Sequence, residues 1–155
     1  MIPDELADNI RSIVAGAKEL STKHTTEGNA PVNYACIFSQ SEKEYDDLIE
    51  IVRGTGSVVH ETAMGPIFHI DPIATVSGEL RLLKIRKPDP KRPERGDADF
   101  TVSDYPAFKE RYLERPGFSI IQRPEMEMIE LSDPEFDVLA YYSHPPLGEV
   151  LGIIQ

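Results

Sequence analysis

The sequence predicts an α+β fold of two tandem βαβββ modules that form cupped mixed sheets, with an extra N-terminal helix. The order of strand, capped helix, glycine, hairpin and strand occurs in residues 33–88 and again in residues 98–145. A segment with helical spacing of its apolar residues precedes the first copy. Such an internal duplication places two open sheets in one chain. We therefore expect the sheets to bury against each other and to enclose a concavity that carries the function.

A single domain is expected over residues 1–155, because a chain of 155 residues that is 40% hydrophobic can bury one core but not two independent ones. Prolines at 88, 90 and 93 exclude a helix between the two copies. The expected parts are an N-terminal helix and loop (1–32), a first module (33–88), a crossover (89–97) and a second module (98–155).

The predicted helices have recognisable starts and ends. The N-terminal helix begins at Pro3 and Asp4 and lays one apolar stripe on the core. In the first module, Ser41 and Glu44 form a capping box after the apolar strand, and glycines end the helix. In the second module, Asp104 caps a helix that has a proline in its first turn. The hairpins that follow are expected at 57–70 and 118–131. The glutamates of the second hairpin (Glu125, Glu127 and Glu130) are expected to form a solvated face or to protect an edge strand.

Composition excludes several classes of partner. The net charge of −11 argues against nucleic acid or an anionic membrane as a general partner, because phosphate groups need a basic face. The sequence has no signal peptide and no apolar run of about 18 residues. Its one cysteine, Cys36, cannot form an internal disulfide, which suits a reducing cytoplasm. A cytoplasmic protein is expected, and a homodimer is left open.

The crossover is the exception to the acidic composition. Six of the 16 basic residues fall between positions 84 and 95 (Lys84, Arg86, Lys87, Lys91, Arg92 and Arg95). We interpret this segment as a solvated linker whose cations reduce the self-repulsion of an acidic chain. A strap that binds a small anion is the alternative.

The element order and the crossover LKIRKPDPKRPERGDADF (83–100) resemble the vicinal oxygen chelate superfamily, which includes glyoxalases, bleomycin-resistance proteins and extradiol dioxygenases. The extra N-terminal helix makes the YecM-like branch the most similar. In metal-using members, the ligands come from the first and last strands of each module. The resemblance places Tyr34 and Asp99 on the first strands, and Lys84 and Tyr141 on the last strands.

These four residues predict a ligand site without a metal or another cofactor. An ammonium at Lys84 brings positive charge where a metal needs negative donors, and a tyrosine ligand must lose a proton with a pKa of about 10. Tyr34, Lys84, Asp99 and Tyr141 are therefore expected to bind a polar or anionic small molecule, with Lys84 lowering the pKa of Asp99. The alternative is that Lys84 and Asp99 merely pair and the two tyrosines pack. No catalytic residue can be named.

A second constellation lies in the first hairpin. If Met64 and Gly65 form its turn, His60 lies directly across from His69, and two imidazoles could bind a displaced metal. Two structural histidines are the alternative that we prefer.

The functional prediction is a small-molecule-binding protein of vicinal-oxygen-chelate type, and whether it is an enzyme stays open. The alternatives are a metal-dependent lyase, isomerase or dioxygenase, and a protein-interaction module with an exposed strand or acidic surface. The sequence does not name the ligand.

Overall fold

The computed structural model describes residues 2–152, so residues 153–155 of the expected second module lie outside the described residues. The helices and strands follow one another in the predicted order, except that the last helix was not predicted. They are α1 (Asp4–His24), β1 (Val32–Phe38), α2 (Glu42–Arg53), β2 (Ser57–Thr62), β3 (Gly65–Thr75), β4 (Gly78–Arg86), β5 (Gly96–Phe100), α3 (Tyr105–Tyr112), β6 (Phe118–Gln122), β7 (Glu127–Leu131), β8 (Val138–His144) and α4 (Leu147–Val150). None of the helices in residues 2–152 is long and apolar enough to cross a membrane.

The strands form one eight-stranded mixed sheet in the order β2-β3-β4-β1-β5-β8-β7-β6. In the first half β1 and β4 are parallel, and in the second half β5 and β8 are parallel. The halves join through the antiparallel pair of β1 and β5. The predicted fold class of two βαβββ modules with an added helix is therefore confirmed. The expectation that the two sheets bury against each other is wrong, because β1 and β5 pair edge to edge and make the sheets continuous.

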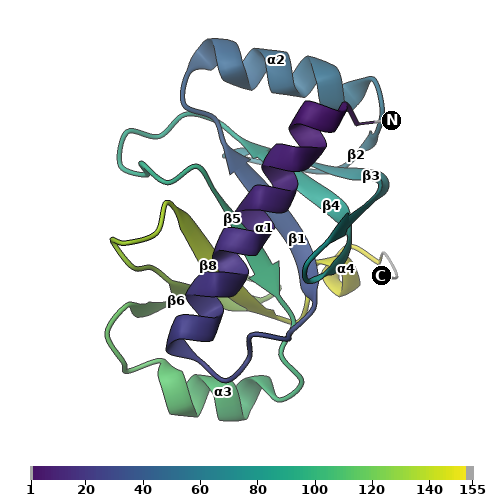
Figure 1. Cartoon of the computed structure of the whole chain (residues 1–155). Coiled ribbons are helices and arrows are strands. Elements are labelled where there is room, and N and C mark those ends of the chain that lie inside the picture. The colour runs from purple at the N-terminus through teal and green to yellow at the C-terminus, as the bar shows by residue number, and fades with distance from the viewer. Residues whose placement is uncertain (1, 153–155) are drawn as a thin grey trace.

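Helix α1 crosses one face of this sheet, while α2 and α3 lie near opposite ends of the molecule (Figure 1). The buried apolar side chains of α1 recur at helical spacing, as predicted, and they join the main core with strand residues from both halves. Ile10, Ile13 and Leu20 are fully buried. Each such side chain contributes roughly 1.5–3 kcal/mol by leaving water, so α1 stabilises the junction between the two modules.

The caps of α2 and α3 agree with the sequence. Ser41 accepts a hydrogen bond from the backbone N–H of Glu44, and the Glu44 carboxylate accepts one from the N–H of Gln40. Asp104 accepts a hydrogen bond from the N–H of Ala107. These local bonds determine where each helix begins, and so where the preceding strand ends.

Candidate functional site

Polar side chains gather on the far face of the sheet, which we define as the face turned away from α1. The core cluster that contains α1 includes strand residues such as Ala35 and Ala98. Their sequence neighbours Tyr34 and Cys36 belong to two smaller clusters that contain no α1 residue. Because successive strand side chains point to opposite faces, Tyr34 and Cys36 lie on the far face.

Three of the four predicted site residues form a row across neighbouring strands. Tyr34 of β1 pairs with Asp99 of β5, and Asp99 pairs with Tyr141 of β8. Lys84 of β4 lies one row away on the same face, opposite Cys36. The registers thus put all four residues on the far face, while their role in binding a ligand stays a prediction.

Asp99 is fully buried in the centre of this face. Its carboxyl group accepts hydrogen bonds from the Ser143 hydroxyl (2.5 Å) and from the Asn33 amide (3.2 Å). Burial outweighs these bonds and raises the pKa of Asp99 to about 7. The prediction that Lys84 lowers this pKa is wrong, because the Asp99 carboxyl group is desolvated and its hydrogen bonds come from other residues. Lys84 and Asp99 form none of the ion pairs within residues 2–152.

Asp97 is a far-face residue that was not predicted from the sequence. This residue pairs with Cys36, so it lies on the far face one row from Asp99. It is only 4% exposed, and its Oδ1 has no hydrogen-bond partner among the described residues. Burial raises the pKa of Asp97 well above its usual value, although the charge of Lys84 opposes this shift. The signal was present in the sequence, because two aspartates two positions apart in one strand must share a face.

Two phenols flank the buried acids. Burial, and then the charges of Asp99 and Asp97, raise the pKa of Tyr34 well above its usual value. Tyr141 donates a hydrogen bond to Glu130 of β7 at 3.1 Å, and burial raises its pKa strongly as well. Both phenols therefore stay protonated at neutral pH and act as neutral hydrogen-bonding groups.

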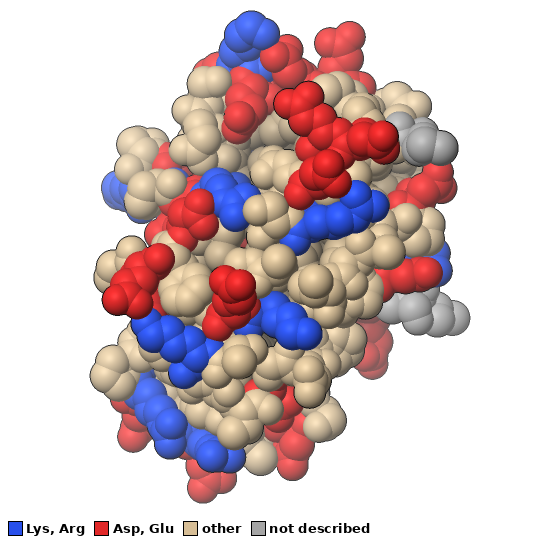
Figure 2. Space-filling model, in the orientation of Figure 1, with Lys and Arg blue, Asp and Glu red and all other residues tan. Residues whose placement is uncertain are grey.

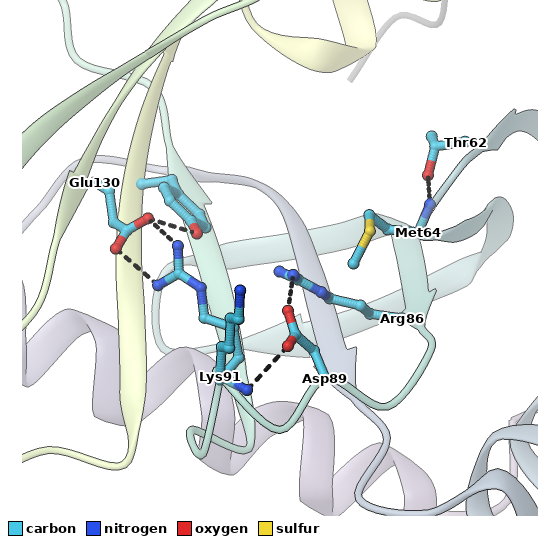
Figure 3. A network of polar contacts seen from close by, with 8 residues as sticks. Thr62, Met64, Arg86, Asp89, Lys91 and Glu130 are labelled. Carbon is cyan, nitrogen blue, oxygen red and sulfur yellow. Dashed lines mark hydrogen bonds and ion pairs between the residues drawn. The ribbon is translucent and has the colours of Figure 1, made fainter.

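The crossover binds to the edge of this site (Figure 3). Arg92 holds both carboxylate oxygens of Glu130 at 3.0 Å, and Arg86 pairs with Asp89 at 3.1 Å. The guanidinium of Arg86 also lies over the ring of Phe38, 4.9 Å from its centroid. The predictions that Arg86 and Arg92 are solvated linker cations and that Glu130 is a solvated glutamate are therefore wrong. Carboxylates of the chain itself neutralise these cations and hold the crossover in place.

The predicted histidine pair does not form. His60 pairs with Ile67, and His69 pairs with Ser57. The hairpin closes one pair earlier than expected, at Thr62 and Gly65. His60 and His69 therefore do not lie across from each other, and a two-histidine metal site at directly opposed positions is excluded.

Two cavities lie beside the far-face residues rather than over them. A cavity of about 680 Å³ at the start of β1 is lined by Asn33 and Ser77, among other residues. Since Asn33 also donates to Asp99, this cavity is separated from the buried acid by one side chain. A second cavity of about 630 Å³ lies between α3 and the β6–β7 turn. Neither cavity is lined by any of the four predicted site residues.

The second cavity contains a small polar cluster that the sequence did not predict. The Tyr105 hydroxyl donates to Glu127 at 2.8 Å, and Lys109 pairs with the same carboxylate at 2.9 Å. The ring of Tyr105 stacks on His144 at 4.9 Å. Glu127 is therefore held by two partners, contrary to the prediction of a solvated glutamate.

Within residues 2–152, no three His, Cys, Asp or Glu side chains are arranged to hold a metal ion. On the face that carries α1, acidic and basic side chains are interspersed (Figure 2). The described residues of that face therefore offer no broad basic surface to a polyanion.

No protein-family model and no curated protein matches the sequence. A solved structure described as structural-genomics protein EC4020 aligns over 96% of this chain and 90% of its own, with a TM-score of 0.72 and 12% identity. This similarity supports the fold alone. Glyoxalase I from Zea mays aligns over 73% of this chain and 42% of its own, with a TM-score of 0.44 and 12% identity. A glyoxalase/bleomycin resistance protein/dioxygenase superfamily member from Vibrio splendidus 12B01 aligns over 74% and 97%, with a TM-score of 0.44 and 10% identity.

Proposed function

We propose that this chain is a small-molecule-binding protein of vicinal-oxygen-chelate type, from the YecM-like branch, and that its site on the far face works without a metal. The observation that carries the proposal is the buried polar group of Asp97, Asp99, Tyr34 and Tyr141 beside Lys84. Burying a carboxyl group without a hydrogen-bond partner costs roughly 1–3 kcal/mol, and a bound ligand recovers that cost. A purely structural core would more simply use apolar side chains at these positions.

The proposed site combines groups of different chemistry. Tyr34 supplies a neutral donor, and Tyr141, whose proton is given to Glu130, supplies a neutral acceptor. Lys84 supplies a cation, and Asp97 and Asp99 supply carboxyl groups whose pKa values are raised by burial. Such a set matches a polar ligand with both donor and acceptor atoms. The absence of an ion pair between Lys84 and Asp99 among the described residues favours this proposal over the structural alternative.

A binding screen tests the proposed function. Purified protein is heated with a panel of small polar and anionic metabolites, and compounds that raise the unfolding midpoint are measured by calorimetry. Lys84→Met and Tyr34→Phe should each weaken the binding of an anionic hit about tenfold or more, because a charge-assisted hydrogen bond contributes roughly 1.5–3 kcal/mol. Lys43→Met on the exposed surface of α2 is the matched control and should leave affinity unchanged. A panel without hits, or hits insensitive to both far-face variants, contradicts the proposal.

The metal content of the purified protein tests the second half of the proposal, that the far-face site works without a metal. Protein purified without chelator should contain well below one equivalent of zinc, iron, nickel or manganese, because Lys84 places a cation where a ligand is needed. Elemental analysis gives the answer directly. One equivalent of metal that is lost in Asp99→Ala would favour the metal-dependent lyase, isomerase or dioxygenase instead.

A further inference from the structure

Two buried polar atoms and one half-buried ammonium group on one part of the far face lack partners. Asp97 Oδ1 and Arg86 Nε are buried and have no hydrogen-bond partner among the described residues. Lys84 is half-buried and takes part in none of the ion pairs within residues 2–152. Buried polar atoms are nearly always paired in folded proteins, so two such atoms without a partner, beside the half-buried Lys84, indicate a missing partner.

The registers place these groups around Cys36. Lys84 pairs with Cys36 from one side, and Asp97 pairs with Cys36 from the other. Since neighbouring strands are about 4.8 Å apart, the Cα atoms of Lys84 and Asp97 are about 10 Å apart, with only a short thiol side chain between them. Arg86 follows two residues after Lys84 on the same face, opposite Phe38. The acceptor therefore stands on one side of Cys36 and the two donors stand on the other side.

The charges of these groups indicate which kind of ligand could satisfy all of them. The positive charges of Lys84 and Arg86 reach Asp97 and favour its ionised form, whereas its burial and the charge of Asp99 oppose ionisation. A ligand with only an anionic group would satisfy the donors but leave Asp97 without a partner. A ligand with only a cationic group would satisfy Asp97 but meet the unpaired charge of Lys84 and leave Arg86 Nε without an acceptor. A zwitterion satisfies both sides and adds no net charge to a buried site.

We propose that the far-face site binds a free α-amino acid, whose ammonium group donates to Asp97 and whose carboxylate accepts from Lys84 and Arg86 Nε. This inference rests on the proposed function and names its ligand class. An α-amino acid has two carboxylate oxygens for the two unpartnered donors and an ammonium group for the unpartnered acceptor. The carboxylate of such a ligand makes charge-assisted bonds, which are shorter and stronger than neutral ones.

Calorimetry with defined probes tests the inference. The intact chain is titrated with the common L-amino acids, and for each one that binds, with its deaminated acid and its decarboxylated amine (acetate and methylamine for glycine). At least one amino acid should bind about tenfold or more tightly than both of its analogues. Asp97→Asn should remove the advantage over the acid, and Lys84→Met should remove the advantage over the amine. Asp47→Asn and Lys43→Met, which break an exposed pair on α2, are the matched controls and should change neither.

The outcomes separate this inference from the proposed function. If simple carboxylates or hydroxy acids bind as tightly as amino acids, and Lys84→Met weakens them, the ligand class is wrong and the site stands. If no probe and no screened metabolite binds, both fail. Should Asp97→Asn not fold, the carboxyl carbon of Asp97 is observed by NMR in the unaltered chain. The pKa given by its titration must fall on saturation with the amino acid, because an ammonium group stabilises the ionised carboxylate, and an unchanged pKa overturns the inference.

Discussion

Replacing Asp99 with asparagine should make the chain increasingly more stable than its parent as the pH rises from 4 to 8. The pKa of Asp99 is raised from 3.8 to about 7 by burial, so the folded state holds this proton more tightly than the unfolded state. Both states are protonated below pH 4, and the parent then loses stability until the pH passes about 7. Raising the pKa of Asp99 from 3.8 to about 7 costs the folded state roughly 4 kcal/mol of stability above pH 7. Asparagine avoids this cost because it does not titrate.

The measurement is the free energy of unfolding by urea at unit steps of pH for both proteins. The difference between variant and parent should rise by up to about 4 kcal/mol between pH 4 and pH 8. Asp97 remains in the variant, and its raised pKa also lowers the stability of both proteins as the pH rises. Only the difference between the two stability curves therefore reports on Asp99. Asp46→Asn on the exposed surface of α2 controls for the loss of one charge. A difference that is constant over this range means that the folded chain already holds Asp99 ionised at low pH.

Replacing Gly65 with alanine should destabilise the fold by about 3–5 kcal/mol, since backbone strain and overpacking each cost roughly 1–3 kcal/mol. Gly65 starts β3 with a φ of +146°, a backbone conformation that residues with a side chain rarely adopt. A Cβ atom at this position would also collide with the backbone carbonyl oxygen of Ile85 in β4. Because that atom belongs to a central part of the sheet, it cannot rotate away as a side chain would.

Gly78 provides the matched control for this prediction. It has a φ of +106°, but a Cβ atom there would meet nothing within 4 Å. Gly78→Ala therefore carries the strain without the collision and should cost about 1–2 kcal/mol. Urea unfolding of both variants checks the comparison. Equal losses of unfolding free energy in the two variants would contradict the prediction, because they would mean that β4 moves to accommodate the methyl group.

Local chemistry determined much of this fold. The bond from the Glu44 N–H to Ser41 and the bond from the Ala107 N–H to Asp104 join residues three positions apart, so the sequence alone predicts the starts of α2 and α3. The stripe of α1 follows from helical spacing in the same way. Since each βαβββ module orders its elements through such signals, the fold class could be predicted before any long-range contact was known.

The tertiary structure alone decided which groups meet. Asp99 is bound by Asn33 and Ser143, which lie 66 and 44 residues away in the sequence, and these contacts depend on the joining of β5 to β1 and β8. A turn at residues 63–64, one residue earlier than predicted, separated His60 from His69. Side chains alternate between the two faces of a strand, so a slip of one residue changes every partner. Local sequence signals therefore determine the elements, whereas strand register determines the site, and register is set by packing over the whole sheet.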